Sequence, residues 1–200
     1  MEKKTIAIFG GSFNPPLNSH LLIAKQILKE YKNIEKIYFV PVSTKYNKTG
    51  LEKDEHRYNM LKIICNNEKQ LEVSNVELNQ EKQLYTIETL NIFKNKFTEY
   101  NICFIVGADN LKEISTWKTP KDLLKNFKII ALERGEERIE DIIKKDDLLK
   151  KYKSSIIIFN NNKIDFSSTE VRNKLKKGEN VDKFLNKDVL EYIKENNLYV

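Results

Sequence analysis

Short apolar runs alternate with amphipathic stretches along most of this chain. The runs at 6–9, 37–40 and 102–106 have the length of strands and are almost wholly apolar, which is typical of parallel strands that are buried on both faces. Between them, 18–31 and 54–64 carry apolar residues at helical spacing. This alternation predicts an α/β fold with a Rossmann-like, open and mostly parallel sheet of five to six strands and flanking helices.

The same patterns predict the remaining elements. Further strands are expected at 71–76, 127–132 and 155–159, and further helices at 86–97, at 121–125 and from 168 onward. The highly charged stretch 136–153 indicates an exposed amphipathic helix or a variable connection. Two hundred residues suit one domain with a real core, so we expect residues 1–200 to form a single domain whose last part, about 166–200, is helical.

Charge and cysteine content narrow the function classes. The chain has 35 Lys and Arg against 29 Asp and Glu, a formal net charge of +6, with the two signs interspersed. This balance suits ligands that carry phosphate and is weak evidence for nucleic acid, so no nucleic-acid partner is expected. Cys65 and Cys103 lie far apart, which argues against a metal site and a disulfide. We expect a cytoplasmic protein with no membrane segment.

A glycine turn directly follows the first strand. Gly10 and Gly11 allow the backbone to turn sharply and to approach a ligand closely. Asn18 or Ser19 is expected to cap the helix that follows, and His20 falls in its first turn. The amides of a helix N-terminus suit phosphate, although an ordinary βα unit with a surface histidine would explain a Gly-Gly turn as well.

A polar loop follows the second strand, at 42–53. It carries Lys45, Lys48 and Lys53 at the carboxyl end of that strand, which is where an open α/β sheet binds its ligand. For any one of these lysines, simple solvation is the alternative interpretation.

The turn after the strand at 102–106 repeats the pattern of the first turn. Gly107 admits a close approach, and the Asp109 carboxylate can accept hydrogen bonds from sugar hydroxyls or can cap a helix. Thr86 precedes another helix and is a reasonable N-cap. Trp117 is the single tryptophan of the chain, and a lone tryptophan most often belongs to the core.

A second cluster of hydroxyl groups lies near the end of the chain. Ser167, Ser168 and Thr169 surround a predicted helix start, and Arg172 follows one turn later. Helix amides, hydroxyls and a guanidinium together bind phosphate oxygens well. The spacing from Ser167 to Glu170 also fits a capping box, which would be a purely structural role.

Taken together, these motifs resemble one family. The string GGSFNPPLNSHL resembles the opening GG(S/T)FDPxHxGH of the nucleotidylyltransferase superfamily, and SSTEVR resembles its ISSTxxR signature. The resemblance to the bacterial nicotinate-nucleotide adenylyltransferases runs nearly from end to end. This sequence departs from the pattern at Asn14, Leu17 and Ser19, where the family usually has Asp, His and Gly.

The resemblance implies an enzyme of NAD biosynthesis that moves AMP from ATP to nicotinate mononucleotide and releases pyrophosphate, with Mg²⁺ travelling with the ATP. It implies catalytic roles for His20 and Arg172. Implied ATP contacts are Gly10, Gly11, Ser12, Phe13, His20, Gly107, Ser167, Ser168, Thr169 and Arg172. Implied acceptor contacts are Lys48, Thr86, Asp109, Trp117 and Arg134.

The departures leave alternatives open. A leucine cannot donate a hydrogen bond to phosphate, and loss of one such donor costs about a hundred- to a thousand-fold in rate. The chain could therefore use another acceptor, such as phosphopantetheine, or bind nucleotide with weak catalysis. On this reasoning, Leu17→His is expected to raise turnover. Assembly into a homo-oligomer is left open.

Overall fold

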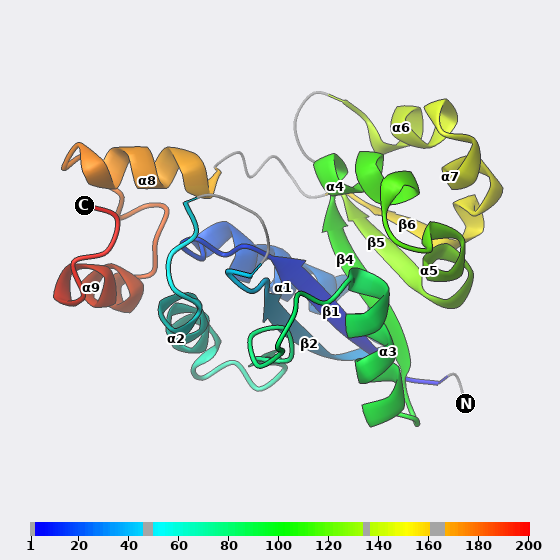
Figure 1. The fold of residues 1–200 in the computed structure, drawn as a ribbon, viewed down its shortest axis with the longest axis horizontal. Helices are drawn as coiled ribbons and strands as arrows, with labels where there is room; N and C mark the ends of the chain where they lie inside the picture. Colours follow the sequence, from blue (N-terminus) through cyan, green and yellow to red (C-terminus); the bar gives the residue numbers. More distant parts are fainter. Residues whose placement is uncertain (1–2, 46–49, 134–136, 161–166) are drawn as a thin grey trace.

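A six-stranded parallel sheet forms the centre of the protein. The computed structural model describes residues 3–45, 50–133, 137–160 and 167–200. The strands are β1 (Thr5–Gly11), β2 (Ile34–Pro41), β3 (Leu71–Val73), β4 (Asn101–Gly107), β5 (Lys128–Leu132) and β6 (Ile156–Phe159), in the order β3-β2-β1-β4-β5-β6 (Figure 1). Every neighbouring pair is parallel. The predicted Rossmann-like α/β fold is confirmed.

Helices cover both faces of this sheet. They are α1 (Asn18–Glu30), α2 (Asp54–Cys65), α3 (Thr86–Lys96), α4 (Ala108–Glu113), α5 (Pro120–Asn126), α6 (Ile139–Lys145), α7 (Asp147–Lys151), α8 (Ser168–Lys176) and α9 (Lys187–Glu195), with short 3₁₀ turns η1 (Ile114–Thr116) and η2 (Lys153–Ser155). In Figure 1, α8 and α9 lie at one end of the molecule beside α2, and α5 to α7 lie at the other end.

Two hydrophobic clusters lie on opposite faces of the sheet and explain the continuous apolar strands. Along β1, Ala7 and Phe9 belong to the cluster that also holds residues of α1, α2, α8 and α9. Ile6 and Ile8 belong to the other cluster, with residues of α3 to α7. Successive side chains of a strand point to opposite faces, so a strand covered on both sides must be apolar at every position.

Two predicted elements differ from the structure. The strand predicted at 71–76 ends at Val73, because only the stretch 71–73 pairs with β2. In the charged stretch 136–153, the predicted amphipathic helix is divided into two helices, α6 and α7, and most of their charged side chains are exposed. Ile139, Ile142 and Ile143 are buried there, at a spacing that places them on one side of α6 against the sheet.

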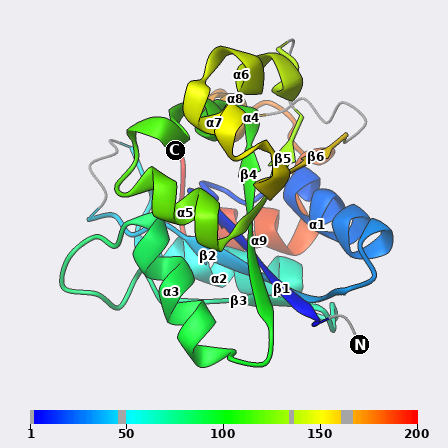
Figure 2. The ribbon, with the colours of Figure 1, turned by 90° about the vertical axis from the view of Figure 1, so that its right-hand side faces the viewer.

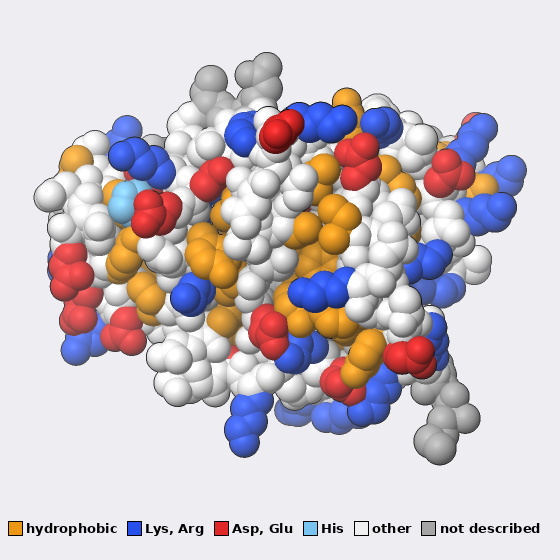
Figure 3. All heavy atoms as spheres, turned by 60° about the horizontal axis from the view of Figure 1, so that its bottom comes forward, with side chains coloured by type: hydrophobic (Ala, Val, Ile, Leu, Met, Phe, Trp, Pro, Cys, Tyr) orange, Lys and Arg blue, Asp and Glu red, His pale blue; other side chains and the backbone are white. Residues whose placement is uncertain are grey.

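The strand order reverses at β1 (Figure 2). The strands β2 and β3 lie on one side of it, and β4, β5 and β6 lie on the other side. In an open α/β sheet, such a switch point opens a crevice at the carboxyl ends of the strands, where ligands bind. On the face seen in Figure 3, apolar side chains gather near the middle and charged side chains of both signs surround them. In the described part of the chain, no helix has the length and apolar character needed to cross a membrane.

Candidate functional site

The two glycines expected in a turn are instead the last residues of β1, where they pair with β2, and the chain turns directly after them with the Phe13 ring folded beneath the backbone. Phe13 has a φ of +46°, in the left-handed region, and its buried ring packs edge-on against Phe9 and Phe39. A Cβ atom added to Gly11 would lie 3.0 Å from this ring, so any larger residue there would have to displace the packed ring by a few tenths of an ångström. The turn thereby leaves Gly10, Gly11 and Ser12 to line a pocket beside the strand.

His20 completes the start of α1. The predicted caps, Asn18 and Ser19, are not used: the N-cap is Leu17, and Asn18 is the first helical residue, with its N–H donating to the Phe184 carbonyl at 2.8 Å. A leucine side chain cannot cap a helix. Instead, the Leu17 N–H donates to Nδ1 of His20 at 2.9 Å. Because Nδ1 accepts this bond, the neutral imidazole carries its proton on Nε2 and can donate there.

Leu17 lies in the hydrophobic core, where only 1% of it is exposed. The departure from the family pattern at this position therefore places an apolar side chain in an apolar environment. This burial removes the basis for expecting a histidine there to raise turnover.

We expect Leu17→His to lower the free energy of unfolding by about 2 kcal/mol, because an imidazole would be buried without a partner. Turnover should not rise. Urea denaturation and an activity assay on the same preparation measure both quantities. Leu17→Met is the matched control, since a similar volume should cost less than about 1.5 kcal/mol. A gain in turnover for Leu17→His would show that the new imidazole reaches the nucleotide.

The second cluster of hydroxyl groups packs against the first turn. Ser167 is the N-cap of α8. Its backbone N–H donates to the Glu170 carboxylate at 2.7 Å, which completes the predicted capping box. Arg172 Nη1 donates to the Asn14 carbonyl at 2.7 Å, and the Ser168 hydroxyl donates to the Pro15 carbonyl at 2.9 Å. The structure thus brings together the two segments that resemble the family signatures. Thr169 is exposed and holds the other end of the guanidinium.

The Asn14 side chain connects the turn after β1 to two distant segments of the chain, the loop at 50–52 and the C-terminal end. Its amide nitrogen donates to the Gly50 carbonyl at 2.8 Å, and its Oδ1 accepts from the Glu52 N–H at 3.1 Å and from the Tyr199 hydroxyl at 2.8 Å. The side chain is only 2% exposed. An aspartate could accept both bonds but could not donate to Gly50. The departure at this position therefore matches its surroundings.

Arg57 is a structural member of the site that the sequence did not reveal. Its side chain is fully buried, and it donates to the carbonyls of Ser12 at 2.8 Å, Val42 at 2.5 Å and Glu52 at 2.9 Å. It also pairs with Asp54 at 2.5 Å. The guanidinium therefore joins the turn after β1 to the loop after β2, at the edge where the ligand is expected.

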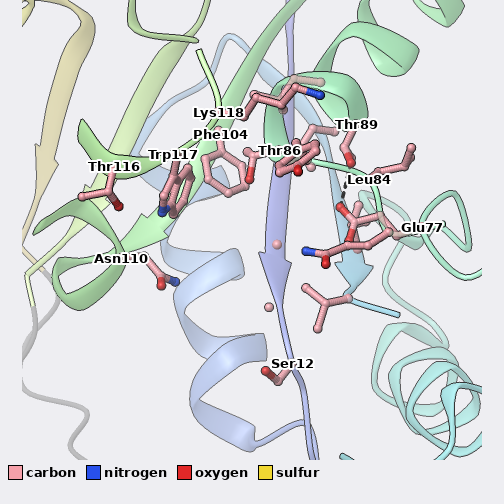
Figure 4. Close-up of a pocket in the computed structure, with 18 residues that line it drawn as sticks. Ser12, Glu77, Leu84, Thr86, Thr89, Phe104, Asn110, Thr116, Trp117 and Lys118 are labelled. Atoms are coloured by element: carbon pink, nitrogen blue, oxygen red, sulfur yellow. Dashed lines mark hydrogen bonds between the residues drawn. The ribbon is translucent and has the colours of Figure 1, made fainter. Parts of the chain in front are cut away.

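A pocket of about 400 Å³ opens between the ends of β1 and β4 and the start of α3 (Figure 4). Two of the predicted acceptor residues, Thr86 and Trp117, line it from opposite sides. Trp117 packs edge-on against Phe104, with ring centroids 6.3 Å apart. Thr86 is the first residue of α3 rather than its cap, which is Tyr85.

Of the other predicted acceptor residues, the structure describes only Asp109, which is not among the pocket residues. Asp109 is exposed in the first turn of α4, which Gly107 caps, and the residue of this turn that lines the pocket is Asn110. Lys48 and Arg134 lie outside the described residues. Pocket residues that the sequence did not single out include Glu77, Thr89, Phe104 and Lys118.

Glu77 brings a carboxyl group into the wall of this pocket. The hydroxyl of the buried Thr89 donates to it at 2.7 Å. Burial raises the pKa of Glu77 to about 7, because desolvation penalises the charged form more than this one hydrogen bond favours it.

The pKa of Glu77 makes stability depend on pH. The ordinary value is 4.5, so the unfolded chain ionises first, and stability is lost as pH rises from about 4.5 through 7. Between pH 5 and pH 8, the unsubstituted protein should lose the free energy of unfolding that the Glu77 carboxyl contributes, and Glu77→Gln should not. The free energy of unfolding of Glu77→Gln should therefore rise by about 2–3 kcal/mol relative to that of the unsubstituted protein over this pH range. Urea denaturation at the two pH values measures this gain. Glu81→Gln, at an exposed position, should show none, and an equal response of both variants would contradict the assignment.

The donor set at this edge of the sheet consists of amides, hydroxyls, an imidazole and guanidinium groups. Within the described ranges, no group of three or more His, Cys, Asp or Glu side chains could hold a metal ion. Such a set suits anionic ligands.

The parallel sheet and its two converging segments match a known class of protein. The cytidylyltransferase-like family model aligns with residues 8–174. The chain is 34% identical over 197 residues to a "Probable nicotinate-nucleotide adenylyltransferase" of Clostridium botulinum (strain Okra / Type B1), covering 96% of this chain and 98% of the relative. A protein of the same name from Clostridium tetani is 34% identical and is covered over its full length.

A solved structure shows the same fold. The Plasmodium falciparum nicotinic acid mononucleotide adenylyltransferase, complexed with NaAD, superposes with a TM-score of 0.82 at 27% identity and covers 98% of this chain and 97% of its own. The chain belongs to the nicotinate-nucleotide adenylyltransferase family, within the cytidylyltransferase-like proteins.

Proposed function

We propose that this protein transfers the adenylyl group of ATP to nicotinate mononucleotide and releases pyrophosphate, a step of NAD biosynthesis. The observation that carries the proposal is the meeting of Arg172 and Ser168 with the turn after β1, next to the pocket that Trp117 and Thr86 line. An anion-binding edge beside an aromatic pocket suits two phosphate-bearing reactants, one of which carries a planar ring. The names of the relatives support the same reaction.

The reaction needs alignment and charge stabilisation more than covalent help. An oxygen of the acceptor's 5′-phosphate attacks the α-phosphorus of ATP, the bond to the β-phosphate oxygen breaks, and pyrophosphate leaves. The protein holds the two anions in line and neutralises the charge that develops between them. In this proposal, Nε2 of His20 donates to the α-phosphate, and this bond strengthens in the transition state.

The remaining contacts are proposed as two groups. The ATP group comprises Gly10, Gly11, Ser12, Phe13, Gly107, Ser167, Ser168, Thr169 and Arg172. In it, the hydroxyls and the guanidinium hold the β- and γ-phosphates. The acceptor group comprises Lys48, Thr86, Asp109, Trp117 and Arg134. In it, the Trp117 indole stacks on the pyridine ring.

Mg²⁺ is proposed to arrive with ATP. The donors at the site fit this, because they would bind the ion only through the phosphates that it accompanies. When bound, the ion neutralises phosphate charge. We further infer that residues 1–200 act as one domain and that the protein works in the cytoplasm.

Pyrophosphate release from ATP and Mg²⁺ tests the proposal. The purified protein would be compared with nicotinate mononucleotide, nicotinamide mononucleotide and phosphopantetheine as acceptors. We expect rapid release with nicotinate mononucleotide. Rapid release with phosphopantetheine alone would identify a different acceptor, and tight ATP binding with no release would identify a nucleotide-binding protein without this activity.

A further inference from the structure

One basic side chain, Lys118, lines the pocket beside Trp117. It follows η1 and Trp117 on one wall and reaches toward the start of α3 on the other (Figure 4). Its Nζ lies 4.1 Å from the centroid of the Tyr85 ring and 3.4 Å from Oε1 of Glu88. The ammonium group therefore lies on the α3 side of the pocket, beside Tyr85.

Lys118 gives this pocket its positive charge. Among the described residues that line the pocket it is the only Lys or Arg, and Glu77 is the only Asp or Glu. The Glu77 carboxyl lies in the wall against Thr89 and is largely protonated below pH 7. Below that pH, an anion in the pocket therefore meets one cation and little opposing charge.

The contact with Glu88 leaves the ammonium group of Lys118 available to a ligand. Its Oε2 accepts the Tyr85 N–H at 2.8 Å as part of the cap of α3, and this bond lowers the pKa of Glu88. The contact with Lys118 uses the other oxygen and is longer, and both side chains are partly exposed. Exposed pairs of this kind contribute little, so the ammonium can turn toward a ligand while Glu88 keeps its backbone partner.

We propose that Lys118 is a specificity-determining residue, which makes the pocket favour an acceptor whose ring carries a carboxylate over one that carries a neutral carboxamide. The inference rests on the proposed function. In this proposal, a ring stacked on Trp117 presents its substituent toward the start of α3, where the ammonium group lies. A carboxylate there gains a charge-assisted hydrogen bond from the ammonium, and a carboxamide gains only a neutral one.

The test compares kcat/KM for nicotinate mononucleotide and nicotinamide mononucleotide. Lys118→Met keeps the aliphatic stem and removes the charge. We expect it to lower the preference for the carboxylate substrate roughly tenfold, through that substrate alone. Lys118→Arg should keep most of the preference. Lys121→Met, an exposed lysine three residues away that is not among the pocket residues, is the matched control and should leave the preference unchanged.

Ionic strength supplies a second measurement. The preference of the unsubstituted protein should fall as salt is added, because a partly exposed charge pair is screened, and that of Lys118→Met should not. An unchanged preference in Lys118→Met, or an equal loss with both substrates, would overturn the inference while the proposed function stands. An unsubstituted protein that uses neither substrate would overturn the proposed function and this inference with it.

Discussion

Replacing His20 by alanine is expected to lower kcat about a hundred- to a thousand-fold. The imidazole is held by the Leu17 N–H, which leaves Nε2 as a preorganised donor at the edge where the nucleotide is proposed to bind. Loss of one such donor in a phosphate-transfer site removes stabilisation that exists mainly in the transition state. For that reason kcat and kcat/KM should fall together, with KM for ATP nearly unchanged.

The chain provides a matched control in its second histidine. His56 lies on α2 and bonds through Nδ1 to the Tyr192 hydroxyl at 2.9 Å, away from the pocket residues. His56→Ala should keep turnover at temperatures where the protein is folded. His20→Ala also loses the partner of the Leu17 amide, which should lower the free energy of unfolding by about 1 kcal/mol. Both variants are therefore assayed at temperatures well below their thermal unfolding midpoints. Equal turnover in the two variants would remove His20 from the mechanism.

Replacing Arg57 by methionine is expected to lower the free energy of unfolding by about 3–5 kcal/mol. The guanidinium is fully buried and satisfies the carbonyls of Ser12, Val42 and Glu52 as well as the Asp54 carboxylate. Its removal leaves these acceptors without this partner, around a position where the side chain itself is fully buried. A loss of this size is a large part of the stability of an ordinary domain.

Urea denaturation followed by circular dichroism measures this loss. The control is Arg138→Met, because Arg138 is exposed and pairs with Glu140 on the surface, where such a pair contributes less than about 1 kcal/mol. Arg57→Lys should be nearly as unstable as Arg57→Met. An ammonium group cannot donate to several carbonyls at once in the forked geometry of the guanidinium. A midpoint for Arg57→Met equal to that of Arg138→Met would contradict the structural role assigned to Arg57.

Much of the fold was predictable because it depends on local patterns. The apolar runs identify strands buried on both faces, and β1, β2 and β4 lie where those runs predict. For the charged stretch 136–153, the pattern favoured an amphipathic helix but left a variable connection open, and the structure forms α6 and α7 there with three isoleucines of α6 buried. Burial against the sheet decided the structure of that stretch, and burial depends on residues far away in the chain.

The site was predictable only in part, for the same reason. Motifs indicated that Trp117 and Thr86 belong to one pocket. They also indicated that Arg172 and the turn after β1 belong to one site. The roles of Asn14 and Arg57 depend on which distant carbonyls lie beside them, and no local pattern reveals that. A buried arginine in a stretch of charged residues reads like any exposed one.

The residue that follows Asn14 has a consequence for the chemical durability of the protein. Asparagine side chains lose their amide over time when the nitrogen of the next residue attacks them, and here the next residue is Pro15, whose nitrogen carries no hydrogen. The side chain is also buried and held at both of its ends. The usual route of spontaneous deamidation is therefore closed at this position, and the amide that donates to Gly50 should be slow to become aspartate.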